Sequence, residues 1–154
     1  NHIQLLEKVF VSVNQQIKSK KFETIINEFF NSYNIIWDFR YILRDNFQKS
    51  FEDDESITKS IKEINNFLDK WAENKILHSH ESGLIKINSK EIENLSEIIL
   101  VIGRYWLDFS MKKYPDVNIS SLRLKGLKHI VTVLSPYLNP EGIPTIENML
   151  KQLK

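Results

Sequence analysis

Hydrophobic residues recur every three or four positions along most of this chain, which is the spacing that places them on one face of an α-helix. Polar or proline-containing stretches separate six segments of this kind. No segment alternates in the way of a half-buried strand, so we expect one all-α domain over residues 1–154. The predicted helices cover residues 3–18, 22–37, 57–71, 91–113, 120–138 and 145–153.

The connections between these segments are less regular. Apolar positions continue from 39 to 47 on a shifted face, which predicts a bend or a short separate helix. An acidic stretch at 52–55 predicts a break, and Ser56 is a candidate cap for the next helix. We expect that helix to fray by Lys75 and to be followed by a polar loop at 78–83.

The run from Ile98 to Phe109 is apolar nearly all the way round a helix, with Gly103, Arg104 and Asp108 as its exceptions. A helix that buries a single stripe is apolar at only three or four positions in two turns. One small domain does not easily cover such a helix on every side. We therefore expect this helix to be shared between the chain's own core and a second copy, which predicts a homodimer.

Composition excludes several classes of protein. Apolar residues make up 42% of the 154 residues and charged residues 27%, a globular balance. The net charge of +1 selects neither nucleic acid nor an anionic membrane. There is no cysteine, and no apolar run approaches the roughly 20 residues of a spanning helix. No signal peptide opens the chain, and we expect a cytoplasmic protein without a membrane partner.

Catalytic and metal-binding motifs are scarce. A di-iron bundle needs Glu-x-x-His pairs, but Lys75, Leu77 and Gly126 stand three positions before His78, His80 and His129. His78 and His80 could chelate a metal, although two histidines in a polar loop are more readily explained as solvated side chains. We predict neither an enzyme nor a cofactor.

Two polar groups stand inside the apolar run. Arg104 and Asp108 are four residues apart, so they share a helix face and can pair. The simpler interpretation is an ion pair within the helix or across a dimer seam. The alternative is that one of them points into a cavity and anchors a polar ligand.

Aromatic residues form a second cluster, in which Tyr33, Trp37 and Tyr41 recur every four positions. Such spacing is more often plain core than a ligand box, yet buried hydroxyl and indole groups need partners. Arg40 and Arg44 are also four apart, and they repel unless Asp38, Asp45 or an anion compensates them.

Three pieces of the sequence resemble a known family. Residues 33–45 (YNIIWDFRYILRD) resemble the aromatic-rich segment of the regulatory domain in TetR/AcrR-type transcriptional regulators. Residues 95–109 resemble that family's penultimate long helix, and residues 126–138, which close on LSPYL, resemble its last. Their order and spacing match, and the resemblance covers residues 3 to 142.

The resemblance implies a C-terminal effector-binding and dimerisation domain. Residues 91–113 and 120–138 are then expected to form a four-helix bundle between two subunits. Implied pocket residues lie among the first four segments; we name Phe29, Tyr33, Trp37, Tyr41, Trp71 and Tyr105. For the dimer interface we name Ile98, Ile102, Tyr105, Leu127, Ile130, Val131 and Leu134.

The family's helix-turn-helix, which reads DNA in the major groove, is missing from this sequence. We expect it upstream of Asn1, so that operator DNA is bound only through that region. The resemblance then implies that a small amphipathic or apolar effector shifts the spacing of two DNA-reading heads. Open alternatives are a helical protein-interaction module and a ligand-binding bundle with no role at DNA.

Overall fold

A computed structural model describes residues 4–5, 8 and 21–153. The helix predicted over 3–18 lies almost entirely outside the described residues. The rest is helical, as predicted, and the described residues form no strand beyond one isolated bridge between Ile85 and Leu138. The helices are α2 (Phe22–Asp38), α3 (Asp45–Lys49), α4 (Glu55–Glu81), α5 (Ile92–Lys113), α6 (Ile119–Leu134) and α7 (Ile143–Gln152).

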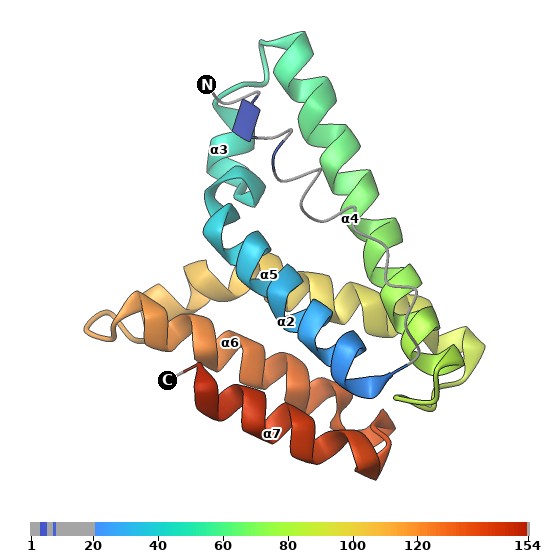
Figure 1. Ribbon diagram of the computed structural model, residues 1–154. Coiled ribbons are helices and arrows are strands. Elements are labelled where there is room, and N and C mark those ends of the chain that lie inside the picture. Colours follow the sequence, from blue (N-terminus) through green and yellow to red (C-terminus); the bar gives the residue numbers. More distant parts are fainter. Residues whose placement is uncertain (1–3, 6–7, 9–20, 154) are drawn as a thin grey trace.

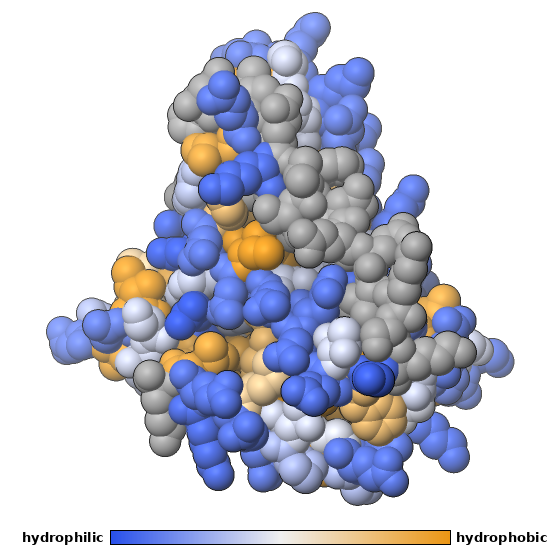
Figure 2. Space-filling model, in the orientation of Figure 1, coloured by the Kyte–Doolittle hydropathy of each residue, from blue (hydrophilic) through white to orange (hydrophobic). Residues whose placement is uncertain are grey.

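Figure 1 shows the arrangement of these helices. The long α4 runs down one side of the molecule, while α5, α6 and α7 lie roughly along one another at its base. The helix α2 crosses in front of α5, and its far end leads into α3 near the start of α4. On the face shown in Figure 2, hydrophilic side chains cover the upper end of α4, and hydrophobic patches are separated by polar groups.

Side chains of Asp and Asn start several of the helices. The carboxylate of Asp54 accepts a hydrogen bond from the backbone N–H of Ile57 at 3.0 Å, which caps α4. The prediction that Ser56 caps this helix was wrong, because Ser56 lies inside the first turn. Asn118 caps α6 in the same way, through the N–H of Ser120.

The helix α4 is longer than predicted. It does not fray at Lys75 but continues to Glu81, because Leu68, Ala72 and Ile76 extend its buried face at spacings of four. The predicted polar loop at 78–83 is therefore mostly helix. It ends at Gly83, whose φ of +83° is a backbone conformation that glycine adopts without strain.

The bend predicted after Trp37 is confirmed. The helix α2 ends at Asp38, a single 3₁₀ turn covers Arg40–Leu43, and α3 follows. At the other end of the fold, α6 stops at Leu134 rather than Leu138. Pro136 has no N–H to continue an α-helical ladder, and Ser135–Tyr137 forms a 3₁₀ turn instead.

The core holds a close junction at Gly126 of α6. The Tyr33 hydroxyl donates a hydrogen bond to the carbonyl of Arg123 at 2.8 Å, and the Trp106 indole donates to the carbonyl of Leu122 at 2.7 Å. Both rings pass over Gly126, where a Cβ atom would lie 2.5 Å from Cδ1 of Trp106. Only glycine allows α2 and α5 to approach α6 this closely.

Candidate functional site

A pocket opens between α2, α4, α5 and α6. About 430 Å³ of empty space, part of it open to solvent, lies among its lining atoms. Its walls are apolar and aromatic apart from one guanidinium. The lining residues are Phe29, Tyr33, Ile36, Leu43, Leu68, Trp71, Ile99, Leu100, Gly103, Arg104 and Ile130.

Two nitrogen donors of this pocket have no hydrogen-bond partner. They are Nε1 of Trp71 on α4 and Nε of Arg104 on α5, and both atoms are hidden from solvent. A buried donor without an acceptor costs free energy, of the order of 1–3 kcal/mol, so such atoms are rare in native proteins. These two atoms mark the pocket as the candidate functional site.

The rest of the Arg104 side chain belongs to a polar chain that leads away from the pocket. Its guanidinium donates to the side-chain oxygen of Asn65, and the amide of Asn65 lies 3.4 Å from the side-chain oxygen of Gln48. Gln48 in turn donates to the carbonyl of Ile42 at 3.2 Å. These contacts orient Arg104 while leaving its Nε free.

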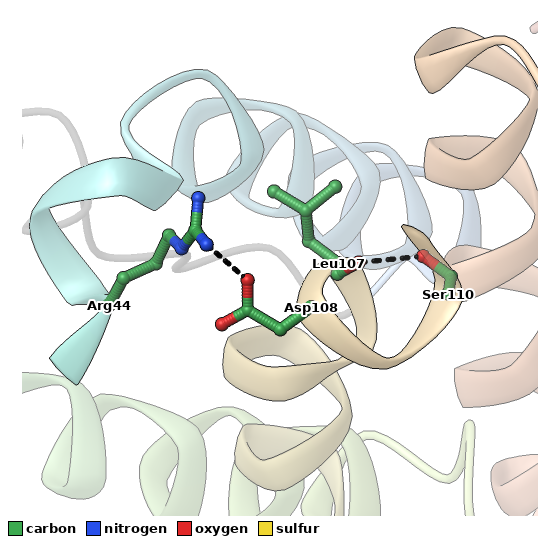
Figure 3. Close-up of polar contacts among 4 residues, drawn as sticks. All are labelled: Arg44, Leu107, Asp108 and Ser110. Atoms are coloured by element: carbon green, nitrogen blue, oxygen red, sulfur yellow. Dashed lines mark hydrogen bonds and ion pairs between the residues drawn. The ribbon is translucent and has the colours of Figure 1, made fainter. Parts of the chain in front are cut away.

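The predicted pair between Arg104 and Asp108 is not formed. Asp108 instead forms an ion pair with Arg44, as Figure 3 shows. The Nη2 atom of Arg44 lies 2.5 Å from Oδ1 of Asp108. Arg44 directly follows the 3₁₀ turn after α2, and that turn brings it to α5. Figure 3 also shows the buried Ser110 hydroxyl, which donates to the carbonyl of Leu107. Sequence spacing identified the helix face but could not identify a partner 64 residues away.

The other arginine of the aromatic cluster is compensated differently. Arg40 donates to the carbonyl of Trp37 at 2.7 Å, and its guanidinium lies 4.8 Å from the centroid of that residue's ring.

Three of the six predicted pocket residues line the pocket, namely Phe29, Tyr33 and Trp71. The Tyr33 hydroxyl is already bonded to the Arg123 carbonyl, and burial raises its pKa well above the ordinary value although Arg123 opposes the shift. Whether these residues bind a ligand stays a prediction.

The other three predicted pocket residues lie elsewhere. Trp37 is buried in the core, where its ring stacks on Tyr33 with centroids 6.3 Å apart. Tyr41 falls beyond the end of α2 and packs edge-on against Phe47. Tyr105 is 44% exposed, because it follows Arg104 on α5 and points about a quarter turn away from the pocket.

A second cavity lies next to the first, between α2, α4, α6 and α7. About 600 Å³ of empty space lies among residues that include Ile26, Phe30 and Leu134, and Phe29 borders both cavities. Its one charged group, Lys75, lies 3.7 Å from the carboxylate of Glu28. Desolvation lowers the pKa of Lys75, and Glu28 partly restores it. This cavity offers no unpartnered donor among the described residues.

The outward side of α5 carries an apolar stripe. Its members are exposed to solvent by 44 to 57%, and they follow one another at spacings of three, four and four: Ile98, Val101, Tyr105 and Phe109. A shallow groove beside this stripe is lined from both α5 and α6, by Val101, Ile102, Tyr105, Trp106, Phe109, His129, Thr132 and Val133. We call these residues the outer α5 face.

The residues predicted for a dimer interface divide into two sets. Ile98 and Tyr105 are exposed, while Ile102 and Val131 are half-buried. Leu127, Ile130 and Leu134 are 1, 2 and 9% exposed, because α6 turns them toward the chain's own core. Those three side chains are at most 9% exposed in the single chain, and their assignment to the interface stays a prediction.

Sequence reasoning missed several residues. Asn65 was not singled out, and Gly103 was named only as an exception in the apolar run. Val101 and Phe109 belong to the run that was expected to meet a second copy, but they were not named among the interface residues. The signal for the outer α5 face was present, since the four residues of the apolar stripe share one helical phase. Nothing in the sequence pointed to Asn65, which reaches Arg104 only through the crossing of α4 and α5.

His78 and His80 lie in the last turn of α4 rather than in a loop. The Nδ1 atom of His80 accepts a hydrogen bond from the backbone N–H of Ile87 at 3.3 Å. Within the described residues, no three side chains among His, Asp and Glu are grouped so as to hold a metal ion. In the same part of the chain, every helix is too short or too polar to cross a bilayer.

Comparison with known proteins identifies the fold. The family described as TetR, bacterial transcriptional repressor, matches residues 4–145. A crystal structure of a TetR-family transcriptional regulator from Marinobacter aquaeolei VT8 superposes with a TM-score of 0.76 at 15% identity, covering 99% of this chain and 73% of that one. No curated protein matches this chain. TetR-family regulators are not enzymes, as the sequence predicted. The match over residues 4–145 shows that the chain belongs to the TetR family of bacterial transcriptional regulators.

Proposed function

We propose that this chain is the ligand-sensing and dimerisation domain of its regulator. One observation carries the proposal: α5 borders the pocket on one side and presents the outer α5 face on the other. Ile99, Gly103 and Arg104 face the pocket, while Val101 and Tyr105 face outward. A ligand that displaces α5 therefore also displaces the surface that we assign to the subunit contact.

The outer α5 face supports a second copy as its occupant. An apolar stripe with neighbouring half-buried groups is the kind of surface that proteins cover by association. The exposed side chains of Ile98 and Tyr105 are among those that the sequence assigned to the interface. We propose that α5 and α6 of two copies pack together around this face, with Val101 and Tyr105 near the middle of the stripe.

The proposed mechanism is a population shift. Filling the pocket favours one position of α5, and hence one arrangement of the two copies. In such regulators the DNA-reading heads must match half-sites about 34 Å apart, so a small change in arrangement alters affinity for DNA. A coupling of about 1–3 kcal/mol between the two sites is typical. We propose that the heads lie outside these 154 residues and that the regulator works in the cytoplasm, where operator DNA is found.

Substitution of Val101 by glutamate tests the interface. An unpaired charge placed in an apolar contact is costly to bury, so Val101→Glu should convert the dimer to a monomer in sedimentation velocity at micromolar concentration. The matched control is Val117→Glu, since Val117 is 44% exposed but lies in the turn between α5 and α6. A dimer that survives Val101→Glu, or a monomeric unmodified chain, would contradict the assignment.

A further inference from the structure

The pocket between α4 and α5 contains hydrogen-bond donors that have no acceptor. Its two buried groups without hydrogen-bond partners, Nε of Arg104 and Nε1 of Trp71, are both donors. The Tyr33 hydroxyl donates a hydrogen bond to the Arg123 carbonyl, and neither of the two donors bonds to its oxygen. The remaining lining is apolar. A ligand that satisfies the pocket must therefore bring an acceptor of its own.

The charge of Arg104 narrows further the class of acceptor that a ligand can bring. Arg44 pairs with Asp108 and Lys75 with Glu28, and Arg104 takes part in neither ion pair. Its contact with Asn65 is to a neutral amide oxygen. A half-buried guanidinium without a carboxylate partner favours an anionic acceptor over a neutral one, because charge-assisted hydrogen bonds are roughly twice as strong.

The geometry points to an amphipathic monocarboxylate as the effector, with its carboxylate between Arg104 and Trp71 and its acyl or aryl body among the apolar walls. The two carboxylate oxygens can accept one hydrogen bond from each donor. A single negative charge balances the single cation of the pocket. The inference rests on the proposed sensing function and specifies the ligand class for that site.

Side chains from three helices would surround the apolar body of such a ligand. Leu68 comes from α4, Ile99 and Leu100 from α5, and Phe29 from α2, so an acyl chain would touch three helices. Apart from the chain neighbours of Gly103 and the backbone of α5, no atom lies within 4 Å of the position that a Cβ would take, which leaves open space there. The carboxylate and the first carbons of the chain can lie there without displacing a side chain of α5.

Binding of matched eight-carbon probes tests the class of ligand. Octanoate, 1-octanol and octylamine share one apolar body and differ in charge, and calorimetry on the 154-residue chain measures each affinity. Octanoate should bind at least tenfold more tightly than 1-octanol, and octylamine most weakly. Equal or weaker binding of octanoate, or no binding of any probe, would overturn the assignment of a carboxylate.

Variants of the two donors locate the site. Arg104→Gln keeps an amide donor for Asn65 but removes the charge, and it should weaken octanoate binding about ten- to hundredfold while leaving 1-octanol unchanged. Trp71→Phe removes one donor and should weaken octanoate about three- to tenfold. Octanoate binding that is unaffected by both variants would place the ligand elsewhere and refute the site.

Arg123→Gln is the matched control. Arg123 is also half-buried and also donates to an asparagine, Asn34, at 3.0 Å, but it does not line the pocket. It should bind octanoate as the unmodified chain does. Circular dichroism of every variant separates lost binding from lost folding, and Arg104→Lys, which restores the charge, should recover part of the octanoate affinity if Arg104→Gln is folded.

Failure of this inference differs from failure of the proposed function. If 1-octanol binds as well as octanoate and competes with it, the pocket still takes ligands but not by charge. If octanoate binds through Arg104 and the sedimentation behaviour and intersubunit geometry do not respond, the ligand class stands and the sensing role fails.

Discussion

Gly126 provides a sharp test of the packing that supports the site. In Gly126→Ala, the new methyl group would lie 2.5 Å from Cδ1 of Trp106 and 2.6 Å from the hydroxyl oxygen of Tyr33. Both distances are far below van der Waals contact, so both rings must move. Their hydrogen bonds to the carbonyls of Leu122 and Arg123 are then strained or lost.

The expected cost follows from these contacts. Two weakened hydrogen bonds cost about 1–3 kcal/mol together and overpacking about 1–3 kcal/mol, while replacing glycine inside a helix regains about 1 kcal/mol. We expect Gly126→Ala to lower the free energy of unfolding by about 1–5 kcal/mol. Urea denaturation at fixed protein concentration, followed by circular dichroism, measures the change.

Gly103→Ala is the matched control, because Gly103 is also helical but nothing lies within 4 Å of its Cβ position. That variant should be as stable as the unmodified chain or up to about 1 kcal/mol more stable, from helix propensity alone. If Gly126→Ala proved as stable as Gly103→Ala, the close approach of α2, α5 and α6 would be wrong.

Two further outcomes follow from named contacts. Tyr33→Phe should lose about 0.5–1.5 kcal/mol of stability at neutral pH with the bond to Arg123. Because burial raises the pKa of Tyr33, the neutral hydroxyl stabilises the fold below its ordinary pKa of about 10, and that stabilisation is lost as pH rises further. Urea titrations should therefore show the difference between the two proteins shrinking above pH 10, and a constant difference would contradict the burial of this group. A double-mutant cycle of Arg44→Ala and Asp108→Ala should give a coupling of only about 0.2–1 kcal/mol that falls with salt, since both side chains are more than a third exposed. A salt-independent coupling above about 2 kcal/mol would show that the pair is buried in solution.

Much of the architecture could be predicted from the sequence because helix periodicity is a local signal. The bend after Trp37 and the extent of α5 followed from the phase of the apolar residues. The length of α4 could not be predicted in this way. Its last two turns are polar on the outside, and only Ile76 is buried there on the inner face. The polar composition of residues 78–83 suggested a loop, whereas the buried apolar side chains of α4 stabilise a continuous helix.

The site was predictable only in part, for a physical reason. Spacing along one helix shows which residues share a face, but not which neighbouring helix they meet. Arg104 and Asp108 share a face, yet their partners, Asn65 and Arg44, come from α4 and from the turn after α2. The same limit explains the interface, where the phase of α6 relative to the core decided that Leu127 and Ile130 face inward.

We propose that α5 joins the pocket to the contact between two copies. The chain contains no cysteine, so a single Glu97→Cys substitution at an exposed position of α5 accepts one spin label per copy. Pulsed dipolar spectroscopy of this labelled chain should give one defined intersubunit distance, and that distance should shift when octanoate occupies the pocket. The absence of any intersubunit distance, or an identical distance with octanoate bound, would refute this role of α5.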